Sequence, residues 1–374
     1  MKVLVTGANG FIGKNLLQTL AERADVEVVQ FTRDDTVVAL PAKVADVDFV
    51  IHLAGINRSQ IQDDFETGNV DLTAALADAL RGLRRPVPLI YSSSAQAAAD
   101  NPYGDSKRKA EGLLFALGRE TGAPAHIFRL PNVFGKWCRP NYNSAVATFC
   151  HNIARGLPIT VNDPDAPLKL VYIDDLVSEI VGLLDGQAGV RDAAGFAFLL
   201  PVYETNVGHV AERIAAFRDS RNTLVTARVG TGFERALYAT YVSYLPTELF
   251  AYPVPMHTDP RGTFVEMLKT EDSGQFSFFT AYPGVTRGGH YHHSKTEKFL
   301  VIKGEALFKF RHMLSGEIYD LKTSGETAQI VETVPGWTHD ITNTGSDEMI
   351  VMLWANEIFD RLRPDTFAAP LGDL

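Results

Sequence analysis

The sequence predicts two folded parts, an α/β domain built on a parallel sheet and an all-β domain after it. The length of 374 residues corresponds to about two to three domains of typical size. Up to residue 185 or so, short apolar runs alternate with segments of helical periodicity, which indicates parallel strands joined by helices. From Phe250 onward polar and apolar residues alternate between turns, which is typical of an antiparallel sandwich or barrel.

The expected elements follow the chain in this order. The strands of the first part are Lys2–Thr6, Val26–Phe31, Phe49–Leu53, Leu89–Ser92 and Ala125–Arg129, and its helices include Asn15–Ala24, Thr73–Leu83 and Asp105–Gly122. The strands of the second part include Gln275–Tyr282, Lys298–Lys303, Ala306–Arg311, Gln329–Val334 and Glu348–Leu353. The pattern changes between residues 243 and 252, so we place the domains at residues 1–245 and 246–374.

Composition and charge exclude several classes of protein. Hydrophobic residues make up 45% and charged residues 21% of the chain, which argues against disordered, collagenous and coiled-coil proteins. The net charge of -10 disfavours nucleic acid and anionic membranes as partners. No run reaches the roughly 18 to 20 apolar residues of a membrane span, and Met1–Gly7 lacks a signal-peptide core. Because Cys138 and Cys150 form no disulfide framework, we expect a cytoplasmic protein.

A glycine-rich turn directly after the first strand predicts a nucleotide site. The turn is Thr6-Gly7-Ala8-Asn9-Gly10-Phe11-Ile12-Gly13, and it opens the first expected helix. Its glycines allow a tight turn, close approach of the backbone to a pyrophosphate and close helix packing, while the helix N-terminus faces the anion. The residues expected to contact the cofactor here are Gly7, Asn9, Gly10, Phe11, Ile12 and Gly13.

The end of the second strand distinguishes the two nicotinamide cofactors. An acidic residue there accepts hydrogen bonds from the ribose hydroxyls of NADH and repels the 2′-phosphate of NADPH. Here the position holds Thr32 and Arg33, a hydroxyl and a guanidinium that suit the phosphate, so we expect NADPH. Asp34 and Asp35 follow immediately, and a shift of one or two residues would favour NADH instead.

A tyrosine and a lysine near the start of a later helix predict proton transfer. Tyr103 and Lys107 are four residues apart, so both side chains lie on one helix face. An ammonium near a phenol lowers the pKa of the phenol and makes it a usable proton donor, which a ketone needs as hydride arrives. Ser92, Ser93 and Ser94 end the preceding strand, where a hydroxyl can polarise the same carbonyl.

In this order the motifs resemble those of an extended short-chain dehydrogenase/reductase (SDR) of the sugar-nucleotide group. Further matches are His52-Leu53-Ala54-Gly55, Tyr91-Ser92-Ser93-Ser94, Arg129-Leu130-Pro131-Asn132-Val133-Phe134-Gly135 and Val171-Tyr172-Ile173-Asp174-Asp175. The resemblance implies a Rossmann fold with Ser94 as the carbonyl-binding serine, Tyr103 as the acid/base and Lys107 as the modulator of its pKa. It implies further cofactor contacts at Tyr103, Lys107, Leu53, Ala54 and Gly55, and nucleotide-sugar contacts within residues 132–169.

A group of histidines in the second part predicts a metal site. Five of the ten histidines fall between residues 290 and 339. His290 and His292 project from one face of an expected strand, and His293 points to the other face. With Glu297 and His339 they offer three imidazoles and a carboxylate, which suit Zn, Fe, Mn or Ni, zinc being the default where no redox step is needed.

The same residues resemble the cupin family, whose domains are all-β jelly-roll barrels. The likeness rests on Gly284 with His290, His292, Glu297 and Gly304, and on Pro335-Gly336-Trp337-Thr338-His339 with Asn343. Residues 259–264 and 284–291 also resemble the sugar-nucleotide 3,5-epimerases, which are cupins that work without metal. In that family the residue matching His290 is the base, and the catalytic lysine falls at Glu297. We assign His290 to the metal, and the acid/base pair of an epimerase stays unassigned.

The pairing of an extended SDR with a metal-motif cupin resembles the CapF type of bifunctional capsular-polysaccharide and O-antigen enzymes. The resemblance implies a UDP-linked 4-keto-6-deoxy-N-acetylhexosamine that the cupin domain epimerises at C3 and the SDR domain reduces at C4 with NADPH. The product would be UDP-N-acetyl-6-deoxy-L-talosamine, and both fold types favour a homodimer. One alternative is a plain NADPH-dependent 4-ketosugar reductase whose zinc cupin serves dimerisation; another is a nucleotide-sensing protein without turnover.

Overall fold

The computed structural model describes residues 1–61, 63–255, 257–259, 262–264, 268–270, 274–357 and 362–371. The chain divides into two compact units, which are Met1–Trp137 with Leu168–Glu204, and Cys138–Pro167 with Thr205–Leu374. The second unit therefore combines part of residues 1–245 with the all-β part. The boundary between residues 245 and 246 stays a prediction about the sequence.

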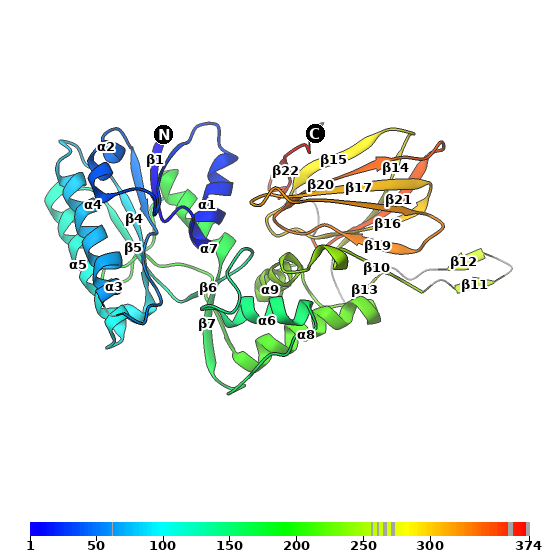
Figure 1. Cartoon of the computed structure of the whole chain (residues 1–374), viewed down its shortest axis with the longest axis horizontal. Helices are drawn as coiled ribbons and strands as arrows, with labels where there is room; N and C mark the ends of the chain where they lie inside the picture. Colours follow the sequence, from blue (N-terminus) through cyan, green and yellow to red (C-terminus); the bar gives the residue numbers. More distant parts are fainter. Residues whose placement is uncertain are drawn as a thin grey trace. The chain divides into compact units, whose positions relative to one another are not determined.

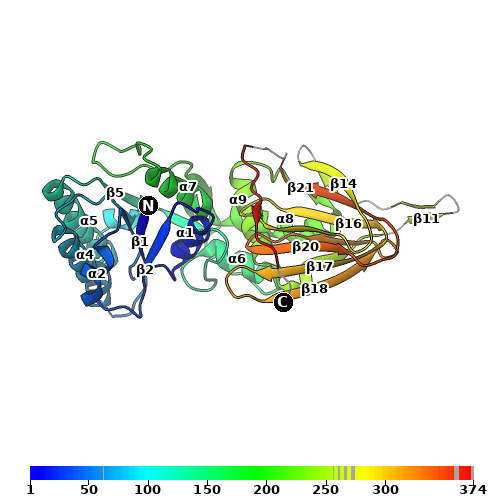
Figure 2. The ribbon, with the colours of Figure 1, turned by 90° about the horizontal axis from the view of Figure 1, so that it is seen from above.

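The first unit is built on a five-stranded parallel sheet in the order β2-β1-β3-β4-β5. Its strands are β1 (Lys2–Thr6), β2 (Glu27–Phe31), β3 (Phe49–His52), β4 (Leu89–Ser94) and β5 (Ala125–Leu130). Figures 1 and 2 show one group of helices on one face, α2 (Leu40–Val44), α4 (Leu72–Arg81) and α5 (Pro102–Thr121), and another on the opposite face, α1 (Phe11–Ala21) and α7 (Ile173–Leu184). Because helices cover both faces, β3 is buried along its whole length. The predicted α/β class is confirmed.

Local sequence determines where helix α5 begins and ends. The Asn101 side chain accepts a hydrogen bond from the N–H of Gly104 at 2.8 Å, and Pro102 occupies the first helical position. Gly122 ends the helix with φ 72°, a left-handed conformation that glycine adopts readily. This start places Tyr103 in the first turn, directly after the end of β4 and a short 3₁₀ turn.

Three helices open the second unit. They are α6 (Ala145–Ala154), α8 (Val207–Thr223) and α9 (Gly232–Ser243). In the second unit, β9 (Val225–Thr226) pairs in parallel with β13 (Lys269–Thr270). A further sheet of β6 (Asn132–Phe134), β7 (Pro167–Tyr172) and β8 (Tyr203–Asn206) lies mostly among residues of the first unit. None of the helices that the structure describes, including α3 (Asp63–Phe65), combines the length and apolar character of a membrane span.

The remainder of the second unit contains two antiparallel five-stranded sheets (Figure 1). One has the order β10-β19-β16-β21-β14, with bounds Ala251–Pro253, Gln329–Glu332, Glu297–Lys303, Met349–Ala355 and Gln275–Ala281. The other has the order β18-β17-β20-β15-β22, with bounds Ile318–Ser324, Glu305–His312, Trp337–Asn343, Thr286–Tyr291 and Phe367–Ala368. A hairpin joins β11 (His257–Asp259) to β12 (Gly262–Phe264). Aromatic rings such as Phe250 and Trp337, with centroids 5.1 Å apart, fill the core, and the predicted jelly-roll class is confirmed.

A buried ionic cluster joins the helices of the second unit to its sheets. Glu332 on β19 forms ion pairs with Arg221 on α8 and with Lys298 on β16. The Lys298 ammonium also donates to the Tyr252 hydroxyl at 3.0 Å, and the Arg221 guanidinium lies 4.1 Å from the centre of the Tyr252 ring. These charges compensate one another away from water, which explains why helix α8 belongs to the same compact unit as the sheets.

Candidate functional site

The glycine-rich turn adopts the conformation that a nucleotide cradle requires. Gly7 has φ 69°, and a Cβ atom there would lie 2.6 Å from the backbone nitrogen of Ala54. A Cβ atom at Gly13 would lie 2.4 Å from the carbonyl oxygen of Gly7, so neither position tolerates a side chain. Helix α1 begins at Phe11 without a side-chain cap and without acidic residues in its first turn. Its N–H groups are therefore available to an anion.

The end of β2 differs from a typical NADH site in its use of Asp35. The Asp35 carboxylate accepts the backbone N–H of Thr32 at 2.8 Å and forms an ion pair with Lys43 at 3.0 Å. The hydrogen bond from Thr32, followed by the charge of Lys43, lowers the pKa of Asp35. Arg33 and Asp34 are exposed. The Asp35 carboxylate is thus already engaged by Thr32 and Lys43.

The segment after β3 connects the cradle to the proton-transfer residues. The N–H of Ala54 donates to the Thr6 hydroxyl at 3.1 Å. A Cβ atom at Gly55 would lie 2.7 Å from Asn69 Oδ1 and 3.2 Å from Lys107 Nζ. Because glycine has no side chain, residue 55 leaves the space beside the Lys107 ammonium open.

Ser94 lies close enough to Tyr103 for their side chains to interact, and Lys107 lies one turn further along the helix of Tyr103. Burial raises the pKa of Tyr103, and the Ser94 side chain opposes the rise. Burial lowers the pKa of Lys107 to about 8, against the charge of Glu111. The Lys107 ammonium donates to the carbonyl of Ser92 at 3.0 Å, and its expected effect on the pKa of Tyr103 stays a prediction.

Sequence reasoning missed Asn69, which lies in a π-helical segment, Glu66–Asp71. The buried Asn69 side chain accepts the N–H of Ile56 at 2.8 Å and donates to the carbonyl of Ile56 and to Ser106 Oγ, both at 2.9 Å. It therefore holds the chain after β3 against helix α5. π-Helical segments often mark functional sites, and no local sequence pattern signalled this one.

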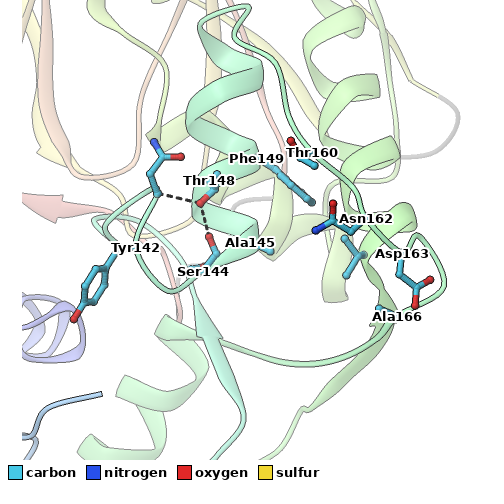
Figure 3. A pocket seen from close by; sticks show the side chains of 11 residues that line it. Tyr142, Ser144, Ala145, Thr148, Phe149, Thr160, Asn162, Asp163 and Ala166 are labelled. Atoms are coloured by element: carbon cyan, nitrogen blue, oxygen red, sulfur yellow. Dashed lines mark hydrogen bonds between the residues drawn. The ribbon is translucent and has the colours of Figure 1, made fainter. Parts of the chain in front are cut away.

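A pocket of about 460 Å³ lies among residues of the second unit (Figure 3). Its lining includes Tyr142, Phe149, Thr160 and Asn162, which offer aromatic, hydroxyl and amide groups. The Thr148 hydroxyl donates to the Ser144 carbonyl at 2.8 Å and supports one wall. Pockets of this size hold small molecules. Nearly all of the lining falls within residues 132–169, where nucleotide-sugar contacts are expected.

The four predicted metal ligands come together within the β sandwich. His290 lies on β15, His292 directly after it, Glu297 on β16 and His339 on β20, so both sheets contribute. Their potential ligand atoms all lie within 4.8 Å of one another. His293 points away from this group, as expected, and packs against Phe367. Pro260 and Arg261 of the epimerase-like segment lie outside the described residues.

The donor atoms of this group fit a divalent cation. The carbonyl oxygen of Asp365 accepts a hydrogen bond from His292 Nδ1 at 2.6 Å, so Nδ1 carries a proton. The other ring nitrogen, Nε2, lies 3.0 Å from Glu297 Oε2. Neither ring nitrogen of the buried His339 has a hydrogen-bond partner, although Nε2 lies 3.6 Å from the same oxygen. Buried ring nitrogens that lack a partner, close to a buried carboxylate, favour a bound cation.

The pKa values of the group agree with that fit. Burial lowers the pKa of His290 to about 4 and also lowers the pKa of His339. Burial alone would raise the pKa of Glu297, but the charge of His292 and its contact with the Glu297 carboxylate at 3.0 Å hold that pKa well below the usual range. Burial thus favours neutral imidazoles at His290 and His339 beside an ionised Glu297, and these donors suit Zn²⁺.

The chain matches two protein families over different residues. Residues 3–192 match the NAD dependent epimerase/dehydratase family. Residues 257–367 match the Polysaccharide biosynthesis C-terminal domain. The first match covers the glycine-rich turn and the tyrosine and lysine, and the second covers the histidines.

Full-length relatives share both parts. The UDP-2-acetamido-2,6-beta-L-arabino-hexul-4-ose reductase of Pseudomonas aeruginosa is 61% identical over 373 residues, which is 100% of each chain. The capsular polysaccharide assembling protein CapF of Staphylococcus aureus is 39% identical, with a TM-score of 0.68 over 99% of this chain and 100% of that chain. A CapF structure with the inhibitor 3-isopropenyl-tropolone is 36% identical, with a TM-score of 0.61 over the same shares.

Proposed function

The chain belongs to the NAD dependent epimerase/dehydratase family, in the CapF type with a C-terminal polysaccharide-biosynthesis domain, and on that premise we propose a bifunctional sugar-nucleotide enzyme. Its substrate is a UDP-linked 4-keto-6-deoxy-N-acetylhexosamine. The second part epimerises C3, and the first part then reduces the C4 ketone with NADPH to UDP-N-acetyl-6-deoxy-L-talosamine. The observation that carries the proposal is the presence, in one chain, of a glycine-rich cradle with a half-buried tyrosine and of a group of four side chains that could hold a cation.

The order of the two steps follows from the chemistry of the ketone. A carbonyl at C4 acidifies the hydrogens at C3 and C5, so a proton can leave C3 and return to its opposite face only while the ketone exists. Hydride addition at C4 removes that carbonyl. Epimerisation therefore precedes reduction, and the reduction makes the new configuration permanent.

In the reduction, Tyr103 donates its phenolic proton to the C4 oxygen and Ser94 donates a hydrogen bond to the same oxygen. When bound, the nicotinamide cofactor supplies the hydride. The N–H groups at the start of α1 hold the pyrophosphate, for which Gly7 and Gly13 leave room. Because burial raises the pKa of Tyr103, the phenol stays protonated and ready to donate at neutral pH.

The residues after β2 support NADPH as the cofactor. Arg33 is exposed at the expected position of the ribose, and Lys43 lies in the helix beside it. Asp35 is engaged with Thr32 and Lys43, which weakens its competition for the ribose hydroxyls. A 2′-phosphate would gain a guanidinium partner in this position.

In the epimerisation, His290, His292, Glu297 and His339 hold a divalent cation, for which we propose zinc. When bound, the ion supplies Lewis acidity toward an oxygen of the sugar. A tropolone carries two adjacent oxygens, as bidentate metal chelators do, so the tropolone inhibitor of CapF supports a metal in this type of protein. The residue that removes the C3 proton is not assigned.

A homodimer in the cytoplasm completes the proposal. Strand β14 lies at the edge of its sheet, and its Phe278 side chain is 70% exposed. Phe276 on the same strand is 48% exposed and Tyr282, directly after it, is 72% exposed. Exposed apolar side chains along an edge strand favour contact with a second copy.

One experiment tests both steps in the intact protein. The protein is incubated in heavy water with NADPH and the UDP-linked 4-keto-6-deoxy-N-acetylhexosamine, and NMR follows the product. We expect NADPH oxidation, an inverted C3 that carries deuterium, and a hydroxyl at C4. Oxidation with C3 unchanged and free of deuterium would favour the plain reductase with a structural zinc cupin. No oxidation would overturn the reductase assignment.

A further inference from the structure

We propose that residues 362–371 form part of the cation site, with Asp365 as a positioning residue that orients His292 and shapes the loop before Glu297. The inference rests on the proposed function, because it assumes that the histidine group binds a cation. The segment lies about seventy residues beyond the loop that it contacts.

The backbone of Asp365 sets the protonation of one proposed ligand. Its carbonyl oxygen lies 2.6 Å from His292 Nδ1. A carbonyl can only accept, so Nδ1 carries a proton and Nε2 is the ring nitrogen left to face the other proposed ligands. It lies 3.0 Å from Glu297 Oε2 and would bind the cation when it carries no proton. Ligating histidines commonly hold their second nitrogen in this way, which fixes the tautomer and the ring orientation.

The side chain of Asp365 shapes the loop between two ligands. Its carboxylate accepts three consecutive backbone N–H groups and one hydroxyl, from His293 at 2.9 Å, Ser294 at 2.9 Å, Lys295 at 2.7 Å and Ser294 Oγ at 3.1 Å. These residues make up most of the chain between His292 and Glu297. A loop held at three successive amides cannot shift either ligand without breaking charge-assisted hydrogen bonds.

Further contacts fasten the segment beside the other ligands. Strand β22 pairs with β15 at His290, and the N–H of Ala369 donates to the Gly289 carbonyl at 2.8 Å. The Thr338 hydroxyl, next to His339, donates to the Ala369 carbonyl at 2.5 Å. The Lys295 ammonium donates to Thr366 Oγ1 at 2.8 Å. The segment therefore touches the chain within a residue or two of every proposed ligand, which a remote structural anchor would not need to do.

The test compares Asp365→Asn with Asp320→Asn in the full chain. Asp365 has φ 38°, a left-handed conformation that aspartate and asparagine both tolerate, so the substitution removes charge and one acceptor without new backbone strain. Asp320, exposed on β18, is the matched control. Zn²⁺ affinity is measured by competition with a chromophoric chelator. We expect a loss of about 10- to 100-fold for Asp365→Asn and no change for the control.

A spectroscopic readout separates orientation of the ligands from general stability. Co²⁺ bound to the wild-type protein is expected to absorb in the visible range, and Asp365→Asn is expected to shift that spectrum. Wild-type protein that binds neither Co²⁺ nor Zn²⁺ would overturn the cation site itself. Tight wild-type binding with an unchanged affinity and spectrum in the variant would overturn only the role of Asp365.

A measurement on the wild-type protein keeps the inference testable even if the variant fails to fold. Hydrogen–deuterium exchange of residues 362–371 is compared with and without Zn²⁺. We expect slower exchange in this segment when the ion is bound, because the ion holds His292 and Glu297 in place. Equal exchange in both states, with Zn²⁺ binding demonstrated, would overturn the inference.

Discussion

The two candidate sites control charge in opposite ways. In the first, burial disfavours charge: it raises the pKa of Tyr103 and lowers that of Lys107 to about 8, so the neutral form of each group becomes easier to reach. In the second, the charge of His292 and its contact with Glu297 overcome burial and keep Glu297 ionised. A site that passes a proton works with groups near neutrality, whereas a site that holds a cation needs a permanent anion. The difference predicts which substitutions affect which reaction.

The largest effect is expected from Tyr103→Phe. Loss of the proton donor should lower the rate of NADPH oxidation by about 100- to 10,000-fold, measured by absorbance with the ketosugar. NADPH binding, measured by fluorescence, should stay intact. Deuterium uptake at C3 should also continue, because it belongs to the other site. Unchanged NADPH oxidation in the variant would refute Tyr103 as the proton donor. Loss of deuterium exchange at C3 would contradict the assignment of the two reactions to separate sites.

The second-largest effect is expected from a substitution of Glu297, the carboxylate among the four proposed ligands. Glu297→Gln keeps the shape of the side chain and removes its charge, so Zn²⁺ binding should weaken by about 100-fold or more. This loss is larger than the about 10- to 100-fold loss typical of substitutions at residues that only support the ligands. C3 exchange should fall with it. Exposed Glu326 provides the control, Glu326→Gln. If the variant bound Zn²⁺ as tightly as the wild type, the carboxylate would not be a ligand.

The proposed preference for NADPH rests on one exposed charge, that of Arg33. Arg33→Ala should raise the KM for NADPH by about 10- to 100-fold through loss of a charge-assisted hydrogen bond, and leave the KM for NADH nearly unchanged. Arg84→Ala, also at an exposed position, is the control. A wild-type enzyme that prefers NADH would contradict the assignment at once.

The smallest expected effect is a gradual loss of reductase activity as the pH rises. Above pH 8 the Lys107 ammonium loses its proton, since burial lowers its pKa to about 8, while Tyr103 keeps its proton because burial raises its pKa. If reduction needs the ammonium, kcat/KM should fall by about tenfold for each pH unit above that value. A profile that stays flat up to pH 10 or so would show that Lys107 acts without its charge.

The parts of the sites that depend on short sequence spacing could be predicted. The glycine-rich turn, the four-residue step from Tyr103 to Lys107 and the two-residue step from His290 to His292 follow from the periods of helices and strands. The expected strands also agree closely with the structure, because alternation and turn residues determine them locally. The confirmed fold class rests on these same local patterns.

Features that depend on tertiary packing could not be predicted. Asn69 lies in a π-helical segment that no periodicity indicates, and Asp365 contacts a loop far away in the sequence. The direction of the Tyr103 pKa shift depends on how deeply α5 packs and on where Lys107 donates its hydrogen bonds. The membership of residues 138–167 in the second unit likewise arises from contacts between distant segments.

The buried ionic cluster around Glu332 limits how the two proposed reactions can be studied separately. Cutting the chain after residue 245 would remove Arg221 and leave the buried carboxylate with Lys298 alone. Removing one partner of a buried ion pair lowers the free energy of unfolding by about 3–5 kcal/mol, a large share of the about 5–15 kcal/mol that stabilises a typical domain. Truncated halves would therefore report on damaged folding as much as on catalysis, and point substitutions within the whole polypeptide are the sound way to assign each step.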